Sequence, residues 1–476
     1  MLFSSMLFLW TFLPIVLIGS RLLSRASVIV KNLFLLAASI WFYAWGEPIY
    51  VVLLLVSILL NFILGRILGY ANEKENDTAR RVTLIIAIVI NLLILGYYKY
   101  FDFFIQTVNS IMGKEVMQIR NIALPIGISF FTFQALSYMI DLYRKEYSAQ
   151  KNFIDLALYI SFFPQLIAGP IVKYYEINTQ LTQRTITNEK TAMGVRSFIY
   201  GLAKKVLIAN FMGMIADYIY GLELSQVTGF YAWVGALCYM LQIYYDFSGY
   251  SDMAIGLGRM FGFEFPMNFD LPYISGSIQE FWRRWHISLG TWFREYVYIP
   301  LGGNRKGQTR TLFNLMFVFI LTGAWHGASW NFVLWGLYYG ALIVLERIGL
   351  AKILARKGMG VIRHFYTLTA VLFGWVLFRA EDLHQAGAFI KRMIMPWKYV
   401  FTDVYFWDFT RRIAIAAFVI GVLCSGPLQL LAERICPDYR KYKYGLLESI
   451  FCGLLLLLCM ASLVANTYNP FIYFRF

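Results

Sequence analysis

Charged residues are scarce in this sequence. They make up 14% of the 476 residues, whereas an ordinary soluble domain has about 25%. Hydrophobic residues make up 59%. No polar stretch is long enough to build a core of its own, so a water-soluble protein is excluded and a polytopic membrane protein is predicted.

Cysteine is also rare, and several catalytic signatures are missing. The five cysteines form no C-x-x-C pair, so neither a disulfide framework nor a metal site is predicted. The hydrolase motifs G-x-S-x-G and H-E-x-x-H do not occur. The loop GGNRKGQT at residues 302–309 resembles a phosphate loop, but Gln308 stands where lysine is required. We interpret it as a cytoplasmic basic loop, or as a holder of cofactor or lipid phosphates.

Apolar runs able to cross the bilayer recur along the chain. Each crossing needs roughly 20 residues, and about ten to thirteen crossings are predicted. The first segment carries no Lys or Arg before Arg21 and no cleavage signal, so it is expected to remain as a helix. The runs are residues 2–19, 28–45, 49–68, 82–98, 122–140, 153–168, 195–219, 229–245, 311–345, 365–378, 413–424 and 446–464.

The net charge of +15 is explained by basic loops beside anionic lipid, and no nucleic-acid binding is predicted. Basic residues at 21–31 and 74–81 place these two loops in the cytoplasm and the N-terminus outside. Beyond the fourth helix the alternation of charge gives no clear topology.

Residues 244–304 are too polar for a simple span and are expected to line a site, because irregular backbone at membrane depth survives only inside protein or beside a wet cavity. A helix is predicted from Ser277 to about Tyr298. On it, Glu280 is spaced to meet Arg283 and Arg284. The alternative interpretation is an interfacial helix at headgroup level.

The run at 311–345 is too long for one crossing, since 35 residues of helix would extend about 52 Å. We expect a break in TGAWHGAS, where Gly323 and Gly327 bracket His326. A broken helix inside a membrane commonly lines a binding site.

The chain has four histidines, and two of them lie in these segments. A buried neutral imidazole at His326 could take a proton from an attacking hydroxyl. Acyl transfer from a thioester donor, with His326 as general base, is therefore the functional hypothesis. A hydrogen-bonded structural histidine is the alternative.

Several long motifs occur together in the order typical of one family. They are LPIGISFFTFQALSYMIDLYR, FFPQLIAGPI, YYDFSGYSDMAIGLGRMFGFEFPMNF, PYISGSIQEFWRRWHISLGTWFREYVYIPLGGNRKG, GAWHGASWNFVLWG and NPFIYFRF. The sequence resembles the membrane-bound O-acyltransferase family, in its bacterial alginate O-acetylation branch.

The resemblance implies an all-α fold, with membrane-spanning, re-entrant and interfacial helices around a central funnel. It implies one integral domain over 1–476, with N-terminal helices in 1–110, a catalytic core in 120–345 and C-terminal helices in 360–476. His326 and His286 would be catalytic. The expected donor- and substrate-binding residues are Glu280, Trp282, Arg283, Arg284, Trp285, Asp246, Ser248, Trp325 and Asn331.

The resemblance also implies a multi-pass protein of the bacterial cytoplasmic membrane. The donor would be acetyl-CoA or another acyl thioester from the cytoplasm, with no metal. The acyl group would pass outward to a polysaccharide, or to an extracytoplasmic SGNH-type transferase. Two alternatives stay open: D-alanyl transfer to teichoic acid from a carrier protein, and a transporter or flippase.

Overall fold

A computed structural model describes residues 1–435, 445–465 and 467–472. The regular elements in these ranges are all helical, which confirms the predicted all-α class. Two compact units make up the chain: Met1–Phe198 with Ser251–Pro266, and Ile199–Tyr250 with Met267–Phe476. Every residue predicted for the site belongs to the second unit.

The first unit contains the N-terminal helices. Its helix α2 packs against α6, and α3, α4 and α5 pack against one another. The helices are α1 (Leu13–Leu22), α2 (Val28–Gly46), α3 (Tyr50–Glu73), α4 (Asp77–Met112), α5 (Ile128–Tyr143), α6 (Phe153–Ser161), α7 (Phe163–Leu166), α8 (Tyr174–Thr182) and most of α9 (Asn188–Ala203).

The second unit begins within α9 and includes a π-helical turn, η3 (Lys204–Ala209). It continues through α10 (Asn210–Tyr220) and α11 (Gly229–Met260), whose last residues return to the first unit. The later helices are α12 (Ile278–Arg284), α13 (Ile287–Phe293), α14 (Gln308–His326), α15 (Trp330–Leu345), α16 (Ala351–Leu354), α17 (Gly360–Arg379), α18 (Leu383–Ile394), α19 (Phe406–Phe409), α20 (Arg412–Cys424), α21 (Pro427–Ile435) and α22 (Leu446–Ala465).

Among the described residues, eight helical segments are long and apolar enough to cross a membrane, or nine if the bent pair α20–α21 is one span. The segments fall short of the predicted ten to thirteen for a local reason. The predicted crossing at 153–168, for example, is two short helices, α6 and α7, separated at Phe162. Pro164 in the first turn of α7 cannot donate a backbone hydrogen bond to a continuous helix.

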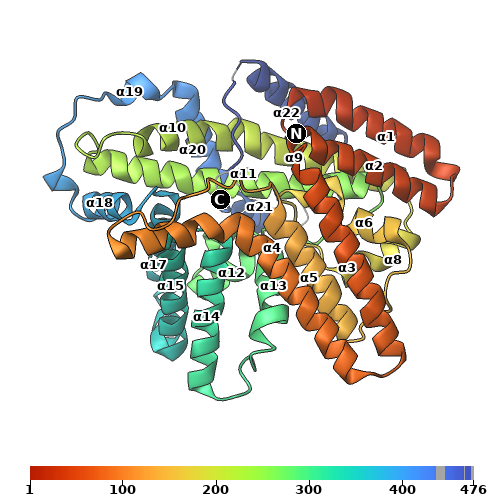
Figure 1. The fold of residues 1–476 in the computed structure, drawn as a ribbon. Helices are drawn as coiled ribbons and strands as arrows, with labels where there is room; N and C mark the ends of the chain where they lie inside the picture. The colour runs from red at the N-terminus through yellow and green to blue at the C-terminus, as the bar shows by residue number, and fades with distance from the viewer. Residues whose placement is uncertain (436–444, 466, 473–476) are drawn as a thin grey trace. The chain divides into compact units, whose positions relative to one another are not determined.

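The run at 311–345 breaks where the sequence predicted. Helix α14 ends at His326, and α15 begins at Trp330. The two helices lie side by side (Figure 1) and fold back on each other, because Gly336 approaches the backbone of Phe319 and Gly340 approaches Met316. A side chain at Gly336 would collide with that backbone. The run is therefore a helical hairpin and not one interrupted crossing.

Charge distinguishes the two ends of this hairpin. The turn between α14 and α15, residues 327–329, carries no charge. Helix α17 runs antiparallel to α15, since Asn331 bonds to Ala380 and Tyr338 to Ala370. The positive-inside rule predicts a cytoplasmic position for the opposite end, where α14 and α17 begin and α15 ends. That end carries Arg305, Lys306, Arg310, Arg347, Lys352, Arg356, Lys357 and Arg363.

Candidate active site

A cavity of about 550 Å³ lies between α12, α13, α14 and α15 of the second unit. Arg347, which follows α15, is part of its lining, so the cavity reaches the basic end of the hairpin. Its lining includes three of the predicted binding residues, Trp282, Arg283 and Trp285. The predicted catalytic residue His286 also lines it. The rest of the lining is Gln279, Ile287, Leu289, Gly290, Thr291, Phe293, Arg294, Tyr298, Leu315, Val318, Phe319, Thr322, Ile343 and Arg347.

His286 interrupts the helix predicted from Ser277 to about Tyr298. Its φ of 45° lies in the left-handed region, which separates α12 from α13. A residue other than glycine rarely adopts this conformation, which costs about 1–3 kcal/mol and is frequent at functional sites. The consequence here is that the imidazole, only 1% exposed, is held at the junction of two short helices.

Asn268 fixes the tautomer of this imidazole. Its Oδ1 accepts the backbone N–H of Ser288 at 3.2 Å and the hydroxyl of Ser288 at 2.9 Å, so the oxygen of the amide must face this side. The Nδ1 atom of His286 lies 3.1 Å from the same oxygen and must therefore donate. Since Nδ1 carries the proton of the neutral ring, Nε2 holds a lone pair.

Nε2 of His286 is buried and has no hydrogen-bond partner among the described residues. Burial lowers the pKa of His286 to about 3, because the charged form is poorly solvated there. Phe247 of α11 packs edge-on against the ring, with centroids 4.6 Å apart. At neutral pH this histidine is a neutral hydrogen-bond acceptor in the wall of the cavity.

His326 occupies the last position of α14 and is 5% exposed. Three rings surround it at centroid distances of 5.0 to 5.1 Å: Trp325, Trp335 and Phe378. Trp325 also contacts His286, with centroids 5.9 Å apart. The two histidines are thus linked through one indole, although His326 is not among the residues that line the cavity.

Three arginines of the cavity lining, Arg283, Arg294 and Arg347, differ from the neighbouring Arg284. Within the described residues, none of the three has a carboxylate oxygen at ion-pair distance. Arg284 instead pairs with Glu280 at 3.0 Å and with Asp270 at 2.9 Å. The three lining arginines can therefore bind an anionic ligand without first breaking an ion pair.

Six of the predicted binding residues do not line this cavity, and one of them, Trp325, packs against both histidines. Arg284 and Glu280 form the i,i+4 pair that their spacing predicted, and this pair stabilises α12. Asn331 donates to the carbonyl of Ala380 and joins α15 to α17. Asp246 accepts from Lys205 and from a backbone amide, and Ser248 is fully buried in α11.

Sequence reasoning missed Asn268, Arg294 and Arg347. Arg294 and Arg347 follow helical segments and resemble ordinary basic residues of cytoplasmic loops. Asn268 lies 18 positions before His286, and the turn-rich stretch between them gives no period that would bring them together. The sequence pointed to Asn268 only through its position in the family motif YYDFSGYSDMAIGLGRMFGFEFPMNF.

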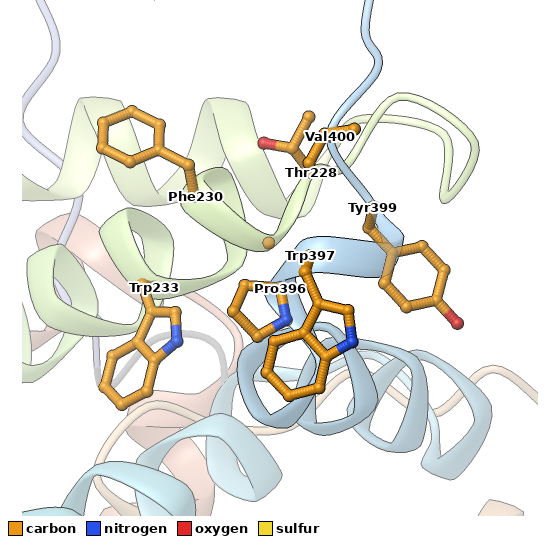
Figure 2. Close-up of a pocket in the computed structure, with 8 residues that line it drawn as sticks. Thr228, Phe230, Trp233, Pro396, Trp397, Tyr399 and Val400 are labelled. Carbon is orange, nitrogen blue, oxygen red and sulfur yellow. The ribbon is translucent and has the colours of Figure 1, made fainter.

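A second cavity of about 540 Å³ lies beside the start of α11 (Figure 2). It is lined by Thr228, Gly229, Phe230, Trp233, Pro396, Trp397, Tyr399 and Val400. Gly229 donates its N–H to the carbonyl of Tyr399, and Trp233 donates to that of Met393. This lining has no charged group and no acid or base, so we assign no chemistry to it.

The apolar helices and a buried histidine beside a partly cationic cavity define the class of protein: a polytopic membrane protein with a candidate active site among its helices. A family comparison names the class. Residues 144–383 match the model of the MBOAT, membrane-bound O-acyltransferase family. The chain belongs to this family and is an O-acyltransferase, a multi-pass protein of the bacterial cytoplasmic membrane.

Similar proteins cover the chain to different extents. The "probable alginate O-acetylase AlgI" of Azotobacter vinelandii is 39% identical over the full length of both chains. The peptidoglycan O-acetyltransferase of Helicobacter pylori is 35% identical over 83% of this chain and 80% of its own. The teichoic acid D-alanyltransferase of Bacillus subtilis is 29% identical over 46% of this chain and 58% of its own.

Proposed function

We propose that this protein takes an acetyl group from acetyl-CoA in the cytoplasm and passes it outward for O-acetylation of an extracytoplasmic polysaccharide. The full-length similarity to an alginate O-acetylase supports acetyl transfer over D-alanyl transfer, because the D-alanyltransferase matches less than half of this chain. The observation that carries the proposal is the cavity at the basic end of the hairpin, which combines unpaired arginines with a neutral histidine.

The lining suits the two parts of acetyl-CoA. Guanidinium groups bind phosphate through paired N–H donors, so Arg283, Arg294 and Arg347 would hold the nucleotide phosphates. Aromatic and aliphatic side chains such as Trp282 and Leu315 would contact the thioester-bearing arm. The lone pair of His286 Nε2 would accept a hydrogen bond from an amide N–H of that arm.

His326 is proposed as the general base. It would remove the proton of an acceptor hydroxyl as the oxygen attacks the acetyl carbonyl; the C–O bond forms, the C–S bond breaks, and the proton passes to the released thiolate. The position of His326 favours this role, because the negative end of the α14 dipole stabilises the imidazolium that results.

The acetyl group then reaches the polysaccharide, and we propose an extracytoplasmic SGNH-type transferase as the partner that completes the transfer. The relatives that act on alginate and peptidoglycan support a cell-envelope polymer. The transporter hypothesis predicts two related broken helices, one in each half of the chain. The break at His326 joins α14 and α15 into a hairpin and is not a break within one crossing helix, which disfavours that hypothesis.

The experiment compares two donors for purified protein in lipid vesicles. Arg294→Glu and Arg347→Glu should raise the KM for acetyl-CoA but leave the KM for acetyl-pantetheine unchanged, because that donor lacks the nucleotide phosphates. Arg356→Glu, at the same basic end but outside the lining, is the matched control. An equal effect on both donors would place the nucleotide elsewhere, and a complete lack of acetyl release from either donor by the parent protein would refute acetyl transfer.

A further inference from the structure

The described part of the C-terminal motif, residues 469–472, enters the core of the second unit. Helix α22 is a candidate membrane span with only 11% of its window buried inside the protein, yet Phe471 and Ile472 are 3% and 2% exposed. The described tail, residues 467–472, therefore follows an apolar helix that is largely exposed and ends in packed protein.

A buried ion pair contacts the backbone of this tail. Lys205 and Asp246, which are 3% and 1% exposed, lie 2.9 Å apart. The ammonium group of Lys205 also donates to the carbonyl of Pro470. The second oxygen of Asp246 accepts the N–H of Ile472 at 2.9 Å. The pair thus binds a carbonyl and an amide two residues apart, as an adjacent strand would.

Side chains of the tail are recognised as well. Tyr468 donates to Asp217 at 2.6 Å, and Arg379 holds the other oxygen of the same carboxylate at 2.9 Å. Asn469 accepts from Asn210. Phe471 stacks on Tyr250, with centroids 4.5 Å apart. Each residue from 468 to 472 therefore has a specific contact within the unit.

The energetics of the pair favour a binding role over a purely stabilising one. Removing two charges from water costs several kcal/mol per ion, and apolar residues of similar volume usually stabilise a fold at least as well. Lys205 is also placed by the π-helical turn η3, and such turns are often found at functional sites. The cost is offset only if both groups satisfy further hydrogen bonds, and the tail supplies those bonds.

Helix α11 connects this pair to the candidate active site. Asp246 holds the tail, and the next residue, Phe247, packs edge-on against His286. We propose that Lys205 and Asp246 form a receptor for the chain's own C-terminal tail, and that the bound tail is a positioning element which holds α11 and Phe247 against His286. The kinetic part of this inference rests on the proposed function, whereas the binding part does not.

The test replaces the pair by apolar residues of similar size, Lys205→Met with Asp246→Leu, so that the fold does not retain an unpaired buried charge. Hydrogen exchange measured by mass spectrometry reports the tail directly. Hydrogen bonds to charged groups are stronger than neutral ones, so exchange in the tail peptide should become about ten- to a hundredfold faster when they are lost, with other peptides of the unit unchanged. The single variant Lys205→Arg, with Asp246 intact, keeps the charge and the donors, so exchange in its tail peptide should stay as slow as in the parent protein.

The kinetic arm uses the same double variant. Its KM for acetyl-CoA should rise about tenfold (1.4 kcal/mol), with kcat unchanged, because the tail acts through His286, which binds the donor, whereas His326 stays in place. Asp77→Asn, which breaks a surface pair with Arg80 in the first unit, is the control and should alter neither readout. Unchanged exchange in the double variant would overturn the receptor. Faster exchange with an unaltered KM for acetyl-CoA would overturn the positioning role while leaving the proposed function intact.

Discussion

The tautomer of His286 is a prediction that a single substitution can test. Replacing Asn268 by alanine removes the oxygen that now accepts the Nδ1 proton at 3.1 Å. A buried donor that loses its acceptor costs about 1–3 kcal/mol. The ratio of the two neutral tautomers should therefore shift by between about five- and a hundredfold toward the form protonated on Nε2.

The assay is nitrogen-15 NMR of protein labelled at histidine. The chain has four histidines, so the ring signals can be assigned by single substitution. The parent protein should show His286 with a protonated Nδ1 and an unprotonated Nε2, and Asn268→Ala should move signal to the opposite form. The KM for acetyl-CoA should rise about tenfold in this variant, which corresponds to the loss of one hydrogen bond.

Ser288→Ala is the matched control for this experiment. It removes the hydroxyl that shares Oδ1 of Asn268 but keeps the bond to His286, so the tautomer should not change. A parent protein in which His286 carries its proton on Nε2 would refute the reasoning, since that ring could not accept a hydrogen bond from the donor.

Three further predictions follow from the same geometry. His326→Ala should abolish acetyl transfer while acetyl-CoA binding, measured by calorimetry, stays at the parental level; transfer at the parental rate would remove His326 from the chemistry. Because the pKa of His286 is about 3 in the folded protein and about 6.5 when unfolded, only the unfolded chain gains this proton as the pH falls from 6.5 toward 3. The free energy of unfolding should decrease over that range, and His286→Gln should flatten the dependence measured by chemical denaturation. Gly336→Ala should lower the free energy of unfolding, measured by chemical denaturation, by about 1–3 kcal/mol, because the new Cβ collides with the Phe319 backbone. The control is Gly387→Ala in α18, where a new Cβ meets nothing within 4 Å, and this variant should keep the parental stability.

Local features of the site could be predicted because they depend on short-range geometry. The Glu280–Arg284 pair follows from the spacing of one helical turn. The break at His326 follows from the length of the run and from its glycines. What length alone does not specify is direction: two helices joined by a short turn can continue across the bilayer or fold back, and the contact between Gly336 and Phe319 decides for the hairpin.

Long-range features could not be predicted because nothing in one sequence reports which distant residues meet. Asp246 was expected in a substrate site, but it holds a tail amide 226 positions away. Asn268 was not singled out, although it sets the hydrogen-bonding state of His286. In both cases the deciding partner is brought in by tertiary packing and not by helical periodicity.

The different surroundings of the two imidazoles lead us to assign them different roles. A general base must hold a proton for as long as the tetrahedral intermediate exists, so its charged form needs stabilisation. Burial lowers the pKa of His286 to about 3, and its Nδ1 proton is already held by Asn268; an imidazolium there would be poorly stabilised. His326 lies at the C-terminal end of a 19-residue helix, where the helix dipole favours a positive charge. We therefore infer that His326 accepts the proton and that His286 binds the donor. The two single variants should differ accordingly, His326→Ala mainly in kcat and His286→Ala mainly in the KM for acetyl-CoA.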